Sequence, residues 1–317
     1  MTNEHKTFSE LLRASFKSDD TEEWLDVHFT RPIGLAFALF WNRFGVHPNV
    51  ITIISFFLGA AAGVMFYFPD LYHNIAGVIL LMFANFCDST DGQMARLTGK
   101  KTLVGRVLDG LSGDVWFLFI YVAIFLRTGN MFYDEIGYSA YFIAFAIAAW
   151  AGFGCHSRQS SLADYYRQIH LFFLLGKEGS ELDNSAEQRK IAESMPKERW
   201  FARLFYSNYA GYCKSQEDRT PKFQTFYEQL RQRYSNPATI PQSLRDEFRR
   251  GSLPLMKYTN LLTFNSRAII VYLSCLLGVP YVYPILEITA YTVMYAHMRR
   301  SHERLSEQMT KRLASFQ

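Results

Sequence analysis

Three carboxylates, Asp88, Asp91 and Asp109, lie where two apolar stretches of the sequence meet. Asp88 and Asp91 are three residues apart, which places them on one face of a helix. Asp109 follows on the next apolar stretch after a short basic turn, so two antiparallel helices would bring the three together. Carboxylates beside hydrocarbon are costly and are seldom placed there without a function. Their oxygens suit hard cations such as Mg²⁺ or Mn²⁺, together with phosphate oxygens.

The elements that carry these residues are predicted to be membrane-spanning helices. The apolar runs 50–68 and 136–155 contain no charged residue. The run 258–277 contains only Arg267, and the run 279–298 contains only Glu287 and His297. Runs of this length are typical of transmembrane helices. The sequence therefore predicts an all-α, polytopic membrane protein with six spans, which cover residues 50–68, 75–97, 102–126, 136–155, 258–277 and 279–298.

The distribution of Lys and Arg predicts the orientation of these spans. The turn at 97–102 is flanked by basic residues, and so is the end of the last span, whereas the opposite loops contain almost none. Basic loops face the cytoplasm, so both termini and the acidic cluster are predicted to be cytoplasmic, in a bacterial inner membrane. The net charge of +4 is small, and its placement indicates membrane topology rather than binding of nucleic acid.

The remaining segments complete the predicted organisation. Residues 1–47 are predicted to form a cytoplasmic arm, loosely ordered up to residue 20. A helix capped by Asp20 or Thr21 follows and is interrupted at Arg31-Pro32. An amphipathic helix over 33–44 then lies in the membrane interface. The further divisions are transmembrane helices 1–4 (48–155), a cytoplasmic helical insertion (156–255), helices 5–6 (256–300) and a tail (301–317). The insertion is interpreted either as a cap or dimer contact, or as a solvated elaboration.

The acidic cluster is part of a longer pattern with fixed spacing. The run is Asp88-x2-Asp91-Gly92-x2-Ala95-Arg96-x8-Gly105-x3-Asp109, preceded by Pro48-Asn49-Val50-Ile51-Thr52. It resembles the signature of the CDP-alcohol phosphotransferases, which are six-span membrane enzymes of phospholipid synthesis. The resemblance covers roughly residues 33–155 and 256–300.

The resemblance implies a reaction and a role for each matching residue. A substituted phosphate would pass from a CDP-linked lipid, such as CDP-diacylglycerol, to the hydroxyl of a small polar alcohol, with release of CMP. Asp88, Asp91 and Asp109 would bind two divalent ions, Mg²⁺ or Mn²⁺. The nucleotide would be bound by residues of the same run: Gly92, Ala95, Arg96 and Gly105. The resemblance also implies a homodimer.

One position departs from the pattern. The family places a fourth Asp four residues after the third, as a general base, whereas this sequence has Gly113 there and Asp114 next. On a regular helix Asp114 would point about 140° away from Asp109 instead of about 40°. A π-bulge absorbs one extra residue and is common at functional sites. We therefore predict that Asp114 acts as base and metal ligand through a π-bulge; the alternative is that Asp114 only caps or pairs locally.

Three basic residues are candidates for binding the acceptor or its phosphate. Arg267 lies within the predicted fifth span, where an arginine normally faces a cavity or a partner. It is interpreted either as an acceptor contact or as the structural partner of Glu287 or of a carboxylate of the cluster. His156 and Arg158, at the end of the fourth span, either line an acceptor pocket or contact lipid headgroups.

Three functions remain open from the sequence. The first is a CDP-alcohol phosphotransferase, with inositol or inositol phosphate favoured as acceptor by the basic residues. Serine and glycerol phosphate remain open as acceptors. The second is a transporter that uses intramembrane carboxylates, and the third is an inactive relative that binds CDP-lipid. Only the departure at Gly113 supports the third.

Overall fold

The structure is a computed structural model that describes residues 7–16, 18–100 and 103–315. These residues form helices joined by turns, without a strand among them. The prediction of an all-α fold is confirmed. The chain divides into two compact units, one of Met1–Ser157 with Phe264–Tyr291 (unit 1), the other of Arg158–Thr263 with Thr292–Gln317 (unit 2).

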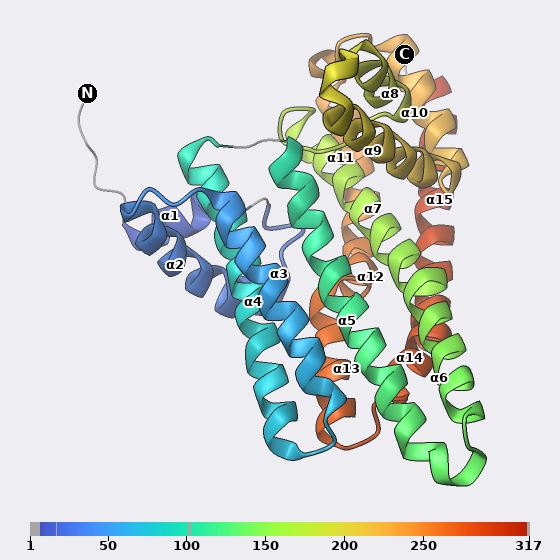
Figure 1. Cartoon of the computed structure of the whole chain (residues 1–317). Helices are drawn as coiled ribbons and strands as arrows, with labels where there is room; N and C mark the ends of the chain where they lie inside the picture. Colours follow the sequence, from blue (N-terminus) through green and yellow to red (C-terminus); the bar gives the residue numbers. More distant parts are fainter. Residues whose placement is uncertain (1–6, 17, 101–102, 316–317) are drawn as a thin grey trace. The chain divides into compact units, whose positions relative to one another are not determined.

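Three long helices form the framework of unit 1: α3 (Pro48–Tyr67), α4 (Leu71–Thr98) and α5 (Leu103–Ile136). The first of these, α3, packs along both α4 and α5 (Figure 1). The other elements are α6 (Ser139–Ala149), the π-turn η2 (Trp150–His156), α13 (Phe264–Leu276), α14 (Val282–Leu286) and the π-turn η6 (Glu287–Tyr291).

Four helices among the described residues are long and apolar enough to cross a membrane: Pro48–Tyr67, Leu71–Thr98, Val107–Ile136 and Ser139–Leu175. They correspond to the first four predicted spans, although the fourth helix continues past residue 155. The membrane class is therefore supported, and the count of six spans stays a prediction. The chain of the predicted fifth span is divided between α12 (Met256–Leu261) and α13, with a break at Leu262 and Thr263.

Small residues bring α3 and α5 into close contact. A Cβ atom added at Gly59 would lie 1.9 Å from Trp116 Cδ1, and one at Gly63 would lie 2.7 Å from the carbonyl carbon of Phe119. Trp116 is buried in the core of the unit together with Phe66. The two glycines therefore set the distance between the helices that carry Thr52 and Asp109.

We expect Gly63→Ala to destabilise the protein by about 1–3 kcal/mol, because the added methyl group forces two packed backbones apart. Gly110→Ala is the matched control on α5, since a Cβ there meets nothing within 4 Å. Thermal unfolding in detergent measures both variants. Equal melting temperatures for Gly63→Ala and Gly110→Ala would contradict the close packing of α3 on α5.

The N-terminal segment is more ordered than predicted. Helix α1 (Phe8–Ser15) begins with a capping box, in which Glu10 N donates to Thr7 Oγ1 at 3.3 Å and Thr7 N donates to Glu10 Oε2 at 2.7 Å. The prediction of a loose arm is therefore wrong for residues 8–15, while residues 1–6 and 17 lie outside the described part. The pattern Thr-x-x-Glu is the sequence signal of such a start.

The predicted interruption at Arg31-Pro32 is also wrong. A π-turn, η1 (Asp26–Thr30), leads directly into α2 (Arg31–Arg43), with Pro32 in the first turn of α2. Proline lacks an N–H and disrupts the ordinary hydrogen-bond ladder of a helix, and the wider π-turn accommodates it. The helix predicted over 33–44 is present, and its buried residues Gly34, Leu35 and Ala38 lie on one face. Its place in the membrane interface stays a prediction.

Unit 2 is a helical assembly built around aromatic side chains. Phe173 stacks on Phe248 with ring centroids 3.9 Å apart, and Phe226 also stacks on Phe248. Proline lies at the start of two of its helices, because α10 begins at Pro221 and α11 follows Pro241. The helices are α7 (Ser157–Leu175), α8 (Ser185–Ser194), α9 (Trp200–Asp218), α10 (Pro221–Arg233), α11 (Gln242–Ser252), α12 and α15 (Thr292–Ser315), with short 3₁₀ turns at Lys197–Arg199, Pro237–Thr239 and Leu253–Leu255.

Candidate metal centre

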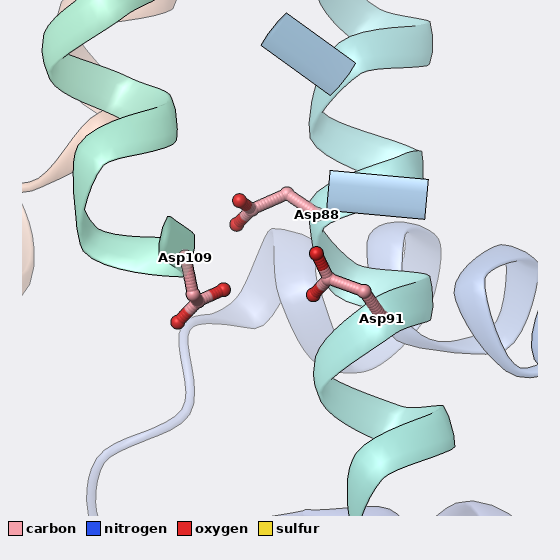
Figure 2. Close-up of side chains that lie close together, drawn as sticks. All are labelled: Asp88, Asp91 and Asp109. Atoms are coloured by element: carbon pink, nitrogen blue, oxygen red, sulfur yellow. The ribbon is translucent and has the colours of Figure 1, made fainter. Parts of the chain in front are cut away.

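The three predicted carboxylates lie together in unit 1. Asp88 and Asp91 project from α4 and Asp109 from α5, and one oxygen of each lies within 4.8 Å of the others. Figure 2 shows the three carboxylates turned toward one another. The prediction that two neighbouring helices bring them together is confirmed. The basic turn between these helices includes residues 101–102, which lie outside the described part of the chain.

The cluster fits a divalent cation. Asp91 is buried, and Asp88 and Asp109 are partly buried, so three carboxyl groups approach one another in a site that is partly shielded from solvent. Such repulsion is relieved when a cation binds, and three carboxylate oxygens are ligands that Mg²⁺ and Mn²⁺ prefer. A cation held by three protein ligands also keeps positions for phosphate oxygens or water.

Two hydroxyl groups from the flanking helices hold the carboxylates of α4. The hydroxyl of Thr52, on α3, donates to Asp91. Ser112, on α5, lies with its Oγ 2.5 Å from Asp88 Oδ1 and 2.6 Å from the backbone oxygen of Asp109. Both hydroxyls are buried. Hydrogen bonds of this kind orient the ligands of a metal and tune its affinity.

The sequence alone predicted no role at the carboxylates for Thr52 or Ser112. A signal for each exists: Thr52 lies in the run Pro48–Thr52 before the signature, and Ser112 lies three residues after Asp109, on the same face of the helix. The spacing does not determine the register between the helices, and this register decides which carboxylate each hydroxyl contacts.

We expect Thr52→Val to weaken Mn²⁺ binding by about tenfold, because it removes the donor to Asp91 while keeping the shape of the side chain. Thr52→Ser keeps the hydroxyl and should bind Mn²⁺ as the unmodified protein does. Electron paramagnetic resonance of free Mn²⁺ in a titration of the purified protein measures this. Equal affinity in Thr52→Val and Thr52→Ser would contradict an orienting role.

The residues predicted to bind the nucleotide lie beside the carboxylates. Gly92, Ala95 and Arg96 follow Asp91 on α4, and all three are partly buried. A Cβ at Gly92 would lie 3.4 Å from Arg96 Nη1, so the guanidinium of Arg96 extends over the bare backbone at Gly92. Gly105 lies four residues before Asp109 on α5, and therefore on the same face. Their contact with a nucleotide stays a prediction.

Asp114 does not join the cluster. The described part of α5 around it is regular α-helix, and the side chain is exposed. The π-bulge predicted at this point is wrong; the π-helical segments of the described chain lie at Asp26–Thr30, Trp150–His156 and Glu287–Tyr291. Ser112 and Trp116, buried on the opposite side of α5, hold this stretch against its neighbours. The regular helix therefore keeps Asp114 on another face than Asp109.

Arg267 forms an ion pair with Glu287. Both side chains are 0% exposed, and Arg267 Nε and Nη2 donate to the carboxylate of Glu287 at 2.8–3.2 Å. The guanidinium also lies over the ring of Tyr291, 5.0 Å from its centre. The structure thus shows the pairing with Glu287 that the sequence left open. An acceptor contact by Arg267 stays a prediction.

The other two acceptor candidates have different surroundings. His156 is buried in unit 1, where its Nδ1 lies 3.1 Å from the hydroxyl of Tyr283 and 3.3 Å from that of Tyr121. Arg158 is exposed and belongs to unit 2, where its backbone oxygen accepts a hydrogen bond from Arg219. Their part in binding an acceptor stays a prediction.

Comparison with known proteins defines the class of this site. Residues 45–167 match the family model of the CDP-alcohol phosphatidyltransferases, and this range contains all three carboxylates. This stretch of the chain is therefore similar to the CDP-alcohol phosphatidyltransferases. This family consists of membrane-associated transferases of substituted phosphate groups that act in phospholipid synthesis.

Two curated relatives match over shorter stretches. The chain is 42% identical over 65 residues to archaetidylinositol phosphate synthase of Pyrococcus horikoshii, covering 20% of this chain and 33% of that protein. It is 34% identical over 70 residues to an uncharacterized protein of Aquifex aeolicus, covering 22% of this chain and 34% of the relative. The chain thus spans about a third of the length of the curated relatives it matches.

Proposed function

We propose that this protein transfers a substituted phosphate from a CDP-linked lipid to the hydroxyl of a small polar alcohol and releases CMP. The observation that carries the proposal is the carboxylate cluster of Asp88, Asp91 and Asp109 inside the matched domain. In this reaction the acceptor oxygen forms a new bond to the lipid-bearing phosphorus, the diphosphate bond breaks, and CMP takes the bonding electrons. The hydroxyl proton passes to a base.

The protein's own residues would hold the reactants as follows. Asp88, Asp91 and Asp109 would bind two divalent ions, which when bound neutralise charge on the diphosphate and on the leaving CMP. Arg96 would add a positive charge beside them, and Gly92 would leave its backbone accessible to the nucleotide. Thr52 and Ser112 would keep two of the carboxylates in place. The cluster is proposed to face the cytoplasm, and the protein is proposed to work as a homodimer.

For the acceptor we propose inositol or inositol phosphate. The support is the relative named archaetidylinositol phosphate synthase, which is 42% identical over the aligned 65 residues, together with basic residues such as Arg158 at the end of the fourth span. His156 is retained as a second candidate contact. Arg267 has less support, because its guanidinium is engaged by Glu287.

The test is acceptor-dependent release of CMP by the purified protein. CDP-diacylglycerol and Mg²⁺ or Mn²⁺ are supplied, and inositol, inositol phosphate, serine and glycerol phosphate are added one at a time. Release that depends on one acceptor establishes the reaction and identifies the headgroup. A transporter would release no CMP, and an inactive relative would bind CDP-lipid in a metal-dependent manner without turnover.

The missing fourth carboxylate gives a separate prediction. A Cβ at Gly113 meets nothing within 4 Å, and position 113 lies about 40° from Asp109 around the helix. We expect Gly113→Asp to raise acceptor-dependent CMP release by at least about tenfold, because it adds a proton acceptor beside the cluster. Gly110→Asp is the control with equally free space on another face. Equal rates for the two variants would contradict the prediction.

Asp114 lies on another face of α5 than Asp109, and Asp114→Asn tests whether it nevertheless acts as the general base. If Asp114 accepts the hydroxyl proton, this variant binds Mn²⁺ normally and loses turnover by about 10²-fold or more. If it retains full turnover, the base lies elsewhere. The double variant Gly113→Asp/Asp114→Asn then shows whether a carboxylate at position 113 restores the rate.

A further inference from the structure

One face of α15 carries a row of exposed basic residues. His297, Arg300 and Arg304 are spaced by three and four positions, which places them on the same side of the helix. All three are exposed, and they line a shallow hollow together with Val293, Ala296 and Ser301. We call His297, Arg300 and Arg304 the basic face of α15.

The charge of this face is not balanced within the part of the chain that the structure describes. No acidic side chain there forms an ion pair with Arg300 or Arg304. The acidic residues of α15 are engaged on its other side, since Glu303 accepts a hydrogen bond from Lys222 N and Glu307 pairs with Lys222 Nζ. Two guanidinium groups therefore remain available in solvent for an external anion.

A neighbouring helix adds an aromatic ring and a further cation. Tyr258, on α12, meets the ring of His297 edge to face, with centroids 4.7 Å apart. The ammonium of Lys257 lies 4.9 Å from the centre of the Tyr258 ring. On α15 itself Val293, one turn before His297, is 72% exposed. Along α15 the face therefore changes from the apolar Val293, through the ring of His297 with Tyr258 beside it, to the basic Arg300 and Arg304.

We propose that the basic face of α15 binds the phosphate headgroup of an anionic membrane lipid. Guanidinium groups match phosphate through paired, charge-assisted hydrogen bonds. Amphipathic rings at the boundary between apolar and basic residues are typical of the headgroup level of a membrane. Clusters of basic residues at this level attract anionic lipids. The exposed Val293 gives the acyl chains an apolar contact, which a free phosphate or a nucleic acid would not use.

This inference is independent of the proposed reaction, because none of its residues belongs to the carboxylate cluster. It can fail while CMP release is normal, and it can hold in a protein without turnover. Its test therefore uses lipid binding rather than activity as the readout.

The experiment compares Arg300→Gln/Arg304→Gln with the unmodified full-length protein in detergent. Native mass spectrometry measures retained phosphatidylglycerol against phosphatidylcholine, and thermal unfolding without added lipid checks that the variant is folded. The control is Arg189→Gln/Lys190→Gln on α8, which removes the same charge from another exposed helix face. We expect the variant to lose about tenfold in affinity for phosphatidylglycerol, and the control to retain it.

Three results would overturn the proposal. The first is an equal loss in variant and control, which would indicate a general charge effect. The second is equal retention of phosphatidylcholine and phosphatidylglycerol by the unmodified protein. The third is stabilisation by millimolar inorganic phosphate that matches the effect of phosphatidylglycerol, which would assign the face to a free anion.

Discussion

Asp91→Asn is expected to abolish metal-dependent release of CMP, lowering the rate by about three orders of magnitude. Asp91 is the most deeply buried carboxylate of the cluster, at 3% exposure, and it is held by the hydroxyl of Thr52. A bound cation supplies several kcal/mol of charge stabilisation in the transition state, and each 1.36 kcal/mol is worth about a factor of ten. Asparagine keeps the shape of the side chain and its acceptor oxygen but removes the negative charge.

The same substitution should have the opposite effect on stability in the absence of metal. Three carboxylates within 4.8 Å repel one another, so removing one charge should raise the melting temperature of the metal-free protein. The further rise on adding Mn²⁺ should be lost, because ligand binding stabilises only through the folded site. Both temperatures are measured by thermal unfolding with and without Mn²⁺.

Asp134→Asn is the matched control. It makes the same chemical change at an exposed position near the other end of α5. It should leave the rate, the melting temperature and the response to Mn²⁺ unchanged. If Asp91→Asn retained its response to Mn²⁺ while Asp134→Asn did not, the cluster would not be the metal site.

The position of this cluster could be predicted from the sequence because it rests on local rules. The spacing of Asp88 and Asp91 fixes their common face, and a short connection makes the next helix antiparallel, so Asp109 returns to the same level. No long-range packing had to be known. The contact of the Ser112 hydroxyl with Asp88 could not be predicted in this way, because it depends on the register of α5 against α4.

Two predictions about the local backbone were wrong: the break at Pro32 and the π-bulge near Asp114. Proline at position 32 suggested a break, and a π-turn over Asp26–Thr30 absorbs it instead. The position of Asp114, one residue after that of the expected fourth carboxylate, suggested a bulge, whereas burial of Trp116 and Ser112 keeps α5 regular. In α5, tertiary packing decides between two local conformations that the sequence makes similarly accessible.

The partner of Arg267 could not be chosen from the sequence either. An arginine at membrane depth needs a counter-charge, and Glu287, twenty positions away, was one of several candidates. The structure makes Glu287 the partner, by placing the carboxylate on the π-turn η6 and the guanidinium on α13. The buried ion pair predicts a loss of stability when either partner is replaced, whereas an acceptor contact by Arg267 predicts a loss of acceptor binding.

We expect Arg267→Met to destabilise the protein by about 3–5 kcal/mol, because it leaves the carboxylate of Glu287 buried without a counter-charge. Glu287→Leu should cost a similar amount by stranding the guanidinium. The double variant Arg267→Met/Glu287→Leu should recover most of the loss, since an apolar pair of similar volume replaces a buried ion pair at little cost. Unfolding by denaturant in mixed micelles measures the three variants as a double-mutant cycle.

The double variant also decides between the two roles of Arg267. If the arginine serves only Glu287, the folded double variant binds the acceptor with an unchanged KM, although its guanidinium is gone. If Arg267 contacts the acceptor phosphate, stability recovers but KM rises, because the lost charge is not replaced. Additive losses of stability in the cycle would contradict the ion pair itself, since two groups that depend on each other cannot be removed independently.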